Sequence, residues 1–247
     1  MFYFDANGRE RADDWRPAVY DSNGLLMVNG HGERLWRPLA NPKALQVSAF
    51  LDAGPRGFGL IQRTRDANAF QDFESHYERR PSLWVEPVGD WGKGSVTLVE
   101  IPSDSEINDN IVAYWQPQEP MGAGKEYAFA YRLSWGDDPP VSHEGGIIAA
   151  TRRGRATLKG ESPIRRFVID WVFPSAGGTP VATDPKAEIT ASTGTISDIN
   201  IEPNPLSGGW RLTFKLDPAG AGLVELRAVL KMEDGRPMET WVYRWTA

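Results

Sequence analysis

The chain has 247 residues and a formal net charge of −6, with 27 Lys and Arg against 33 Asp and Glu. An acidic chain without a Lys/Arg block is not expected to bind nucleic acid. Zero Cys excludes disulfides and cysteine nucleophiles, and three widely spaced His argue against a structural zinc site. No motif indicates a cofactor, and no apolar run approaches the roughly 18 residues of a membrane-spanning helix.

The first half of the chain reads as short strands separated by turns, in keeping with its 25 Gly and 19 Pro. Asn23-Gly24 suits a type I′ hairpin. Between residues 66 and 77 the spacing of Phe70, Phe73 and Tyr77 predicts one amphipathic helix of about three turns, ended by Pro81. Strands are expected over residues 1–4, 25–28, 45–50, 57–63, 82–86, 94–101, 111–115 and 126–135.

A composition change after residue 136 predicts a domain boundary. Gly136-Asp137-Asp138-Pro139-Pro140 is linker-like, and residues 142–160 stay polar and Arg-rich. Six or seven strands then follow in about 100 residues, which is typical of an immunoglobulin-like sandwich without its disulfide. The carboxylates Asp170, Glu188 and Glu225 are expected to face solvent. The strands are expected over 166–173, 187–192, 196–201, 210–216, 224–230 and 239–245.

The stretch from Tyr77 to Gly94 is the main candidate for chemistry. It sets Glu86 and Asp90 beside Trp84 and Trp91, and a sugar-binding or sugar-cleaving cleft needs carboxylates among aromatic rings. An adjacent indole that desolvates Asp90 would raise its pKa, as a general acid requires. The alternative is that the stretch is simply a well-packed strand–turn–strand.

The residues alone leave several possible partners for Asp90. Glu86 could orient Asp90, bind a sugar hydroxyl, or pair with Arg79 or Arg80. Candidates for accepting a proton from water are Asp5, Asp14 and Asp21.

Other site classes find less support in the sequence. There is no Gly-x-Ser-x-Gly motif, and the Gly57-x-Gly59 and Gly92-x-Gly94 pairs lack the rest of a nucleotide-binding loop. The acidic run 104–109 lacks the glycine and the terminal Glu of a calcium loop.

Several longer motifs match one family pattern in collinear order along essentially the whole chain. They resemble the periplasmic glucan biosynthesis protein G/D family, which makes osmoregulated periplasmic glucans. The matching segments are Asp14-Trp15-Arg16-Pro17, Asp21-Ser22-x-Gly24-Leu25, Gly32-Glu33-Arg34-Leu35-Trp36-Arg37-Pro38-Leu39, Gly57-Phe58-Gly59-Leu60-Ile61-Gln62-Arg63, the run Arg80 to Gly94, Asn108-Asp109-Asn110-Ile111-Val112-Ala113 and Gly208-Gly209-Trp210-Arg211-Leu212.

The resemblance implies an all-β periplasmic protein. Residues 1–136 would be the C-terminal part of a large, galactose-mutarotase-like β-sandwich that binds glucan, 137–160 a linker, and 161–247 an immunoglobulin-like domain. It also implies inverting hydrolysis of β-1,2-glucan, with Asp90 as the acid and Asp5 as the base, ahead of Asp14 and Asp21. The implied subsite residues are Gln62, Arg63, Arg65, Tyr77, Arg80, Trp84, Glu86 and Trp91.

Two departures from the family pattern bear on this hypothesis. Family members are about twice as long and begin with an export signal, so the resemblance is to their C-terminal half, and an N-terminal segment or partner chain is expected to complete the sandwich. The family commonly has His-Asp-Ser-Asp-Gly where this chain has Tyr20-Asp21-Ser22-Asn23-Gly24.

These departures leave two alternatives to the enzymatic hypothesis. One is a non-catalytic protein that binds the glucan or docks on the membrane glucan synthase. The other is a fragmentary homologue that folds poorly alone.

Overall fold

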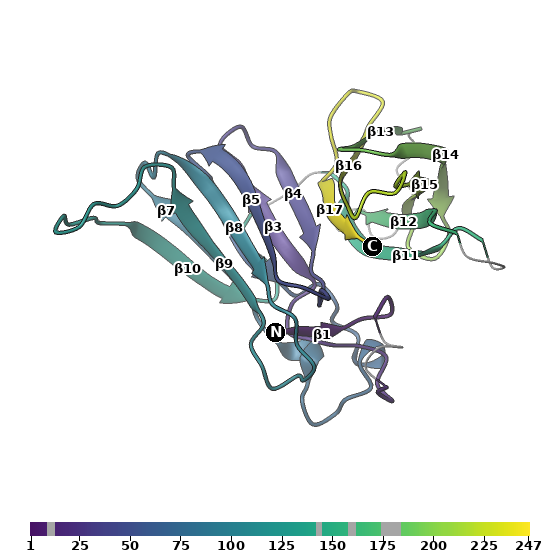
Figure 1. The fold of residues 1–247 in the computed structure, drawn as a ribbon, viewed down its shortest axis with the longest axis horizontal. Coiled ribbons are helices and arrows are strands. Elements are labelled where there is room, and N and C mark those ends of the chain that lie inside the picture. Colours follow the sequence, from purple (N-terminus) through teal and green to yellow (C-terminus); the bar gives the residue numbers. More distant parts are fainter. Residues whose placement is uncertain (9–12, 142–144, 158–161, 174–183) are drawn as a thin grey trace. The chain divides into compact units, whose positions relative to one another are not determined.

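The computed structural model describes residues 1–8, 13–141, 145–157, 162–173 and 184–247. These residues form seventeen strands and two short 3₁₀ turns, so the prediction of an all-β fold is confirmed. The chain divides into two compact units, Met1–Val141 and Ser142–Ala247 (Figure 1). Among the described residues, no helix has the length and apolarity needed to cross a membrane.

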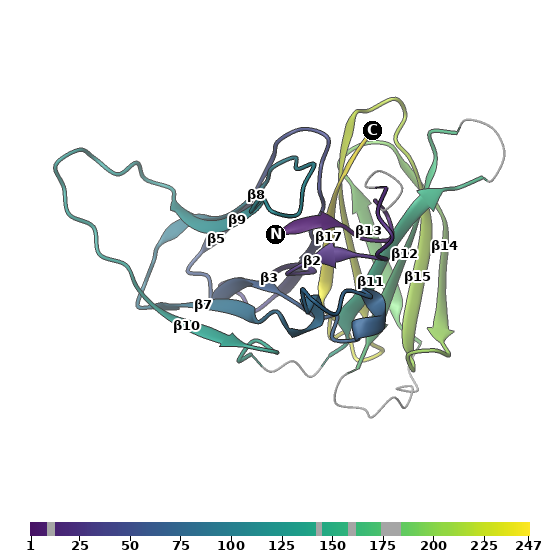
Figure 2. The same cartoon turned by 90° about the horizontal axis from the view of Figure 1, so that it is seen from below.

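The first unit contains two facing sheets and a small ribbon, and Figure 2 shows the sheets as separate layers. One layer has the order β10-β7-β6-β3-β4, the other is β5-β8-β9, and the ribbon is β1-β2. The strands are β1 (Phe2–Phe4), β2 (Val19–Tyr20), β3 (Gly24–Val28), β4 (Arg34–Pro38), β5 (Gln46–Ala53), β6 (Gly57–Ile61), β7 (Ser82–Val88), β8 (Lys93–Glu100), β9 (Ile111–Pro117) and β10 (Ala130–Gly136).

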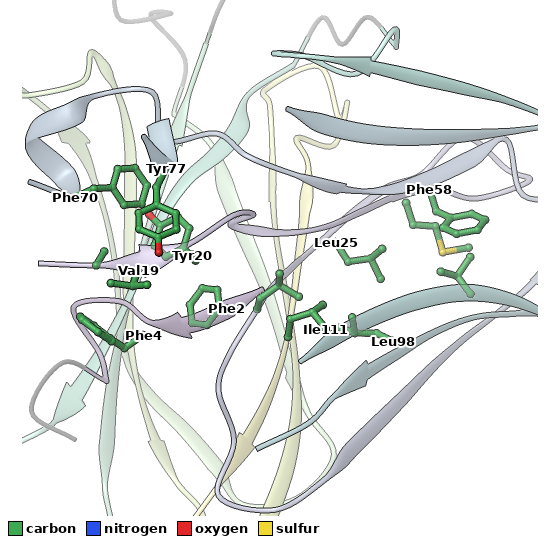
Figure 3. Close-up of a cluster of buried hydrophobic side chains, with 14 residues drawn as sticks. Phe2, Phe4, Val19, Tyr20, Leu25, Phe58, Phe70, Tyr77, Leu98 and Ile111 are labelled. Carbon is green, nitrogen blue, oxygen red and sulfur yellow. The ribbon is translucent and has the colours of Figure 1, made fainter. Parts of the chain in front are cut away.

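Alternating side chains from both layers fill the core of the first unit (Figure 3). Leu25 and Phe58 come from one sheet and Val96 and Leu98 from the other, and all four are buried. Full burial of such a side chain contributes about 1.5–3 kcal/mol. At one end the core continues into aromatic rings, where Tyr20 stacks on Phe2 and meets Phe70 edge-on. These aromatic contacts therefore hold the β1-β2 ribbon against the end of the core that it covers.

The helix predicted between residues 66 and 77 is wrong. The structure has two 3₁₀ turns instead, η2 (Ala67–Ala69) and η3 (Tyr77–Arg79). Asp66 and Asp72 accept hydrogen bonds from nearby backbone N–H groups, which competes with helix formation. Gln71 and His76 also have positive φ angles of 59° and 48°, which no α-helix contains.

The hairpin predicted at Asn23-Gly24 is also wrong, because β2 pairs with β1 whereas β3 pairs with β4 and β6. The Asn23 side chain instead accepts hydrogen bonds from the backbone of Arg63 and Thr64. Gly24 lies against the Trp36 indole, where a Cβ atom would come within 2.4 Å of the ring. The last strand of this unit starts at residue 130, later than the predicted 126.

The described residues of the second unit form a seven-stranded sandwich with sheets β11-β12-β15-β14 and β17-β16-β13. Rings from both sheets meet in its core, where Phe167 stacks on Phe214 and Trp241 meets both edge-on. The strands are β11 (Ile147–Arg155), β12 (Arg165–Val172), β13 (Lys186–Ala191), β14 (Thr195–Asn204), β15 (Gly209–Asp217), β16 (Leu223–Lys231) and β17 (Thr240–Thr246). Strand β11 was not expected from the sequence, because it lies inside the expected linker 137–160.

Asp170 was expected to face solvent, but it is buried. It binds Arg211 at 2.7 Å and Arg152 at 2.6 Å. Burial alone would raise the pKa of Asp170, but hydrogen bonds from these two guanidinium groups outweigh burial and lower it. Glu188 and Glu225 are exposed, as expected.

Candidate functional site

Asp90 lies in the exposed turn between β7 and β8. Its Oδ1 accepts a hydrogen bond of 2.7 Å from the Gly92 backbone. The turn needs glycine, because Gly89 and Gly92 have φ angles of 85° and 71°. The neighbouring Trp91 donates to the Ala130 carbonyl at 3.0 Å, so its indole packs toward β10.

Asp5 follows β1, where its carboxylate accepts hydrogen bonds from the Asn7 backbone and side chain. The Phe2 backbone N–H of β1 donates a hydrogen bond to the Asn110 side chain. Asn110 lies beside the Glu100 end of β8, because Glu100 pairs with the next residue, Ile111. Asp90 lies beyond the Lys93 end of the same strand. Eight residues of β-strand span about 23 Å. The structure thus places Asp5 and Asp90 at opposite ends of β8, whereas an inverting pair stands ~6.5–9.5 Å apart.

Several of the predicted subsite residues hold the fold together. Trp84 is 1% exposed, and its indole packs against Gly57. Gln62 is buried and donates to the Tyr77 carbonyl at 3.0 Å. Arg65 donates to three backbone carbonyls, those of residues 78, 80 and 137.

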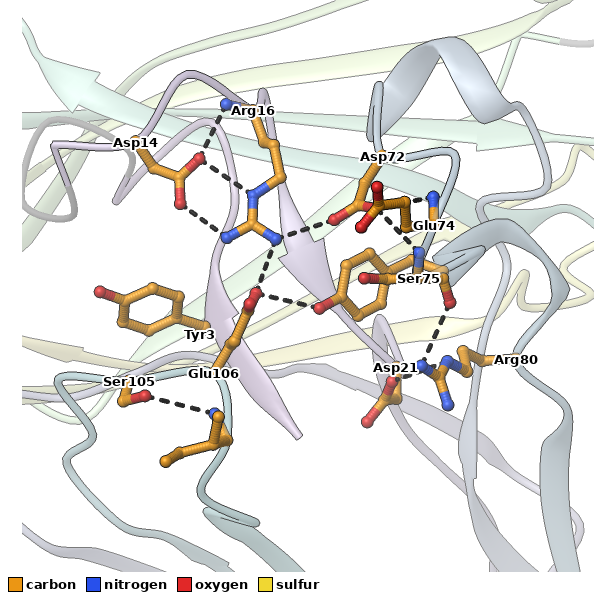
Figure 4. Close-up of polar contacts among 12 residues, drawn as sticks. Tyr3, Asp14, Arg16, Asp21, Asp72, Glu74, Ser75, Arg80, Ser105 and Glu106 are labelled. Atoms are coloured by element: carbon orange, nitrogen blue, oxygen red, sulfur yellow. Dashed lines mark hydrogen bonds and ion pairs between the residues drawn. The ribbon is translucent and has the colours of Figure 1, made fainter.

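The other predicted subsite residues are spread over both ends of the unit. Glu86 forms a surface pair with Arg132 at 3.0 Å. The Arg63 guanidinium stacks on Trp36 at 3.5 Å. Arg80 pairs with Asp21 at 3.4 Å and lies over the Tyr77 ring. Of the predicted residues, Arg80 and the alternative bases Asp14 and Asp21 lie in the same neighbourhood (Figure 4). Tyr77 belongs to it as well, because its ring lies under the Arg80 guanidinium.

That neighbourhood is centred on Arg16, whose guanidinium contacts three carboxylates (Figure 4). Arg16 binds Asp14 at 2.7 Å, Asp72 at 2.8 Å and Glu106 at 2.7 Å. Tyr77 donates its hydroxyl to Glu106 at 3.0 Å. We call Asp14, Arg16, Asp72, Tyr77 and Glu106 the Arg16 site. It joins the segment after β1, the loop between η2 and η3, and the loop between β8 and β9.

Electrostatics in the Arg16 site favour the ionised carboxylates. A hydrogen bond from Arg16 lowers the pKa of Asp14. Burial alone would raise the pKa of Asp72, but hydrogen bonds from Ser75 and Arg16 outweigh burial and bring it to about 2. Burial, with the adjacent Glu106, raises the pKa of Tyr77 to about 12. At neutral pH Asp14 and Asp72 are therefore ionised beside the Arg16 guanidinium, and the Tyr77 phenol stays protonated.

The surface beside the Arg16 site carries an aromatic ring. Trp15, between Asp14 and Arg16 in sequence, is 69% exposed. Glu106 is also accessible, with a side chain that is 34% exposed. Carboxylates, a guanidinium and an exposed indole are the groups that bind the hydroxyls and apolar faces of sugars. The described residues contain no group of three or more His, Cys, Asp and Glu arranged to hold a metal ion.

Sequence reasoning missed Arg16, Asp72 and Glu106 as site residues. Asp72 lay in the expected helix, and Glu106 in the acidic run set aside as a poor calcium loop. The one local signal was the Asp14-Trp15-Arg16-Pro17 motif, in which an acid, an indole and a base are adjacent.

Replacing Arg16 by Gln is expected to lower the free energy of unfolding by about 1–2 kcal/mol at pH 7. The folded pKa of Asp72 is about 2, below its ordinary 3.8, so its contribution is present above pH 4 and is lost as the pH falls toward 2. The difference between wild type and Arg16→Gln should therefore shrink over that interval. Urea unfolding at pH 7, 4 and 2.5 measures it, and a pH-independent difference would contradict this linkage. Arg132→Gln, which breaks an exposed pair, serves as the control.

The fold defines an all-β protein built from two sandwich units. Comparison with known proteins shows that the family model described as "Periplasmic glucan biosynthesis protein, MdoG" matches residues 1–245. The chain therefore belongs to the periplasmic glucan biosynthesis protein family, and the resemblance inferred from the motifs is confirmed.

Curated relatives agree with this assignment. Glucans biosynthesis protein G of Vibrio cholerae is 53% identical over 246 residues, which is 100% of this chain and 45% of the relative. The proteins of the same name from Shewanella putrefaciens and Shewanella frigidimarina are each 54% identical over 246 residues, covering 45% and 44% of their lengths. The chain thus spans about half the length of the curated relatives that it matches.

Proposed function

We propose that the first unit acts in periplasmic glucan biosynthesis by binding the β-1,2-linked glucan backbone at the Arg16 site. The observation that carries the proposal is the convergence of three carboxylates on one guanidinium beside the exposed Trp15. Membership of a family described as periplasmic supports the location and the class of substrate. Docking on the membrane glucan synthase stays a prediction.

The charge of the Arg16 site favours a neutral sugar over an anionic one. Three carboxylates outnumber one guanidinium, so an anionic ligand would meet net repulsion. A neutral glucan offers hydroxyl donors to the carboxylates and hydroxyl acceptors to Arg16. The exposed face of Trp15 covers apolar C–H groups of a pyranose ring.

Replacing Trp15 by Ala is expected to weaken binding of linear β-1,2-glucan about tenfold, because the ring contact is lost while the carboxylates remain. Titration calorimetry with purified linear glucan measures the effect. The matched control is Trp135→Ala, which removes another exposed indole, 65% exposed, on β10. Equal affinity of the Trp15→Ala protein and the wild type would remove the Arg16 site from glucan binding.

Hydrolysis of the same glucan is the second candidate function. Asp72 and Glu106 contact the same nitrogen of Arg16, at 2.8 and 2.7 Å, so their nearest oxygens lie within about 5.5 Å of each other. Paired carboxylates are the catalytic groups of most glycosidases.

Hydrolysis is tested by incubating the chain with linear β-1,2-glucan and following reducing ends and the anomer first formed. Asp72→Asn and Glu106→Gln should each abolish the release of reducing ends. A separation within about 5.5 Å is that of a retaining pair, so the β-anomer is expected to appear first, and an α-anomer appearing first would show inversion. Asp90→Asn tests the acid expected from the resemblance in parallel. Release that persists in Asp72→Asn and stops in Asp90→Asn would move the chemistry to the β7–β8 turn. Release in none of the proteins, with binding intact, would leave the binding function alone.

A further inference from the structure

A group of arginines lies at the end of the hairpin that β11 and β12 form in the second unit. Residues 151–157 and 162–166 contain five Arg and no Asp or Glu, in a chain whose formal net charge is −6. Positive charge is therefore concentrated in one place on an acidic protein. We use the name Arg hairpin cluster for Arg153, Arg155, Arg165 and Arg166, together with Lys215 of β15.

Strand pairing sets like charges against each other in this cluster. Arg155 lies directly opposite Arg165 across β11 and β12, and Arg166 lies directly opposite Lys215 across β12 and β15. Like charges in directly opposite positions destabilise a sheet. Asp198 pairs with Lys215 at 2.5 Å, whereas the Arg165 guanidinium donates to a backbone carbonyl at 2.7 Å, a neutral acceptor that does not cancel its charge. The hairpin thus holds cations together at a cost in stability, which indicates a use for them.

The cluster presents its charges on both faces of the hairpin. The side chains of Arg166 and Lys215 lie on the outer face of their sheet, because the adjacent Phe167 is buried in the core. Arg155 and its partner Arg165 alternate with them and belong to the opposite face. Both Arg155 and Arg166 are exposed. Donors on opposite faces cannot converge on one small anion, but long Arg side chains from both faces reach a flat surface set against the hairpin end.

We propose that the Arg hairpin cluster binds the phosphate groups of an anionic phospholipid surface, with the end of the β11–β12 hairpin set against the membrane. Guanidinium groups match phosphate oxygens with paired N–H donors. Each Lys or Arg close to an anionic membrane strengthens binding about fivefold. The family is described as periplasmic, and membranes bound the periplasm. The acidic remainder of the chain opposes this contact only weakly, since salt screens charges more than about 8–10 Å away.

The test is co-sedimentation of the 247-residue chain with vesicles of phosphatidylglycerol mixed with phosphatidylcholine, and with vesicles of phosphatidylcholine alone. Binding is expected to the anionic vesicles only, and it should weaken as salt is added. The double variant Arg155→Gln and Arg166→Gln should bind about 25-fold more weakly, at about fivefold for each charge removed.

The matched control is the double variant Lys231→Gln and Arg236→Gln, which also removes two surface cations of the second unit. These residues lie at the β16–β17 connection. That connection is beside the other end of β11, because its Glu239 accepts a hydrogen bond from the Ile148 backbone. Binding of the control should equal that of the wild type. On wild-type protein, phenylglyoxal footprinting should show Arg155 and Arg166 protected by anionic vesicles and Arg236 unprotected, a readout that does not depend on how the variants fold.

Several outcomes overturn the proposal. They are absence of binding to the anionic vesicles, equal binding to the neutral vesicles, and wild-type binding by the double Arg variant. Free glycerol phosphate that binds as tightly as the vesicles would make the cluster a small-anion site and refute the membrane contact. Binding of polyglutamate without binding of vesicles would make the partner an acidic polypeptide. None of these readouts involves glucan, so they do not bear on the proposed function of the first unit.

Discussion

Replacing Glu100 by Gln is expected to lower the free energy of unfolding of the first unit by about 3–5 kcal/mol. Glu100 and Arg37 are 0% and 3% exposed, and they join at 2.9 Å between the two layers of the sandwich. The other Glu100 oxygen accepts a hydrogen bond from the Ala40 backbone at 2.8 Å. A neutral amide leaves the buried Arg37 charge without its carboxylate, and it cannot serve both donors as an acceptor.

Urea unfolding followed by tryptophan fluorescence measures this loss, and hydrogen exchange of the β4 and β8 amides assigns it to the first unit. Glu86→Gln is the matched control, because it breaks an exposed pair with Arg132 and should change stability by less than about 1 kcal/mol. Equal effects of the two substitutions would mean that burial does not decide the contribution of the Arg37–Glu100 pair.

The strands of this protein could be predicted from the sequence because their signal is local. Alternation of apolar and polar residues marks β5 and β15, and turn residues bound most of the others. The helix prediction failed because local side-chain hydrogen bonds, which the spacing of apolar residues does not reveal, compete with helix formation. Helical spacing of Phe70, Phe73 and Tyr77 was present, yet Asp66 and Asp72 captured the backbone N–H groups that a helix would have used.

The Arg16 site was harder to predict because its members are distant in sequence. Arg16, Asp72 and Glu106 come from three loops, and only the closure of the sandwich by β1 and β2 brings those loops together. Asp170 shows the same limit, since its burial depends on Arg152 and Arg211 from two other strands. Periodicity identifies which face of a strand a residue occupies, but it does not show that a charged residue will be neutralised there by distant partners.

Trp241 and Trp135 both lie on strands, but Trp241 is buried and Trp135 is exposed. Their substitutions are therefore expected to have very different effects on stability. Replacing Trp241 by Ala is expected to lower the free energy of unfolding of the second unit by about 3–5 kcal/mol. Trp241 is 0% exposed, stacks on Tyr243, meets Phe167 and Phe214 edge-on, and donates to Thr151 Oγ1 at 3.0 Å. Removing the indole opens a cavity between the two sheets and leaves those rings without their central contact.

Trp135→Ala is the matched control, because this indole also belongs to a strand, β10, but is 65% exposed. Its loss should change the stability of the 247-residue chain by less than about 1 kcal/mol. Thermal and urea unfolding of both variants, with hydrogen exchange of β12 and β17 to follow the second unit, measures the contrast. A Trp241→Ala protein with the β12 and β17 protection of the wild type would show that the ring cluster does not hold the second sandwich together. The difference in the free energy of unfolding between the two variants thus measures how much more an indole contributes to stability when it is buried between two sheets.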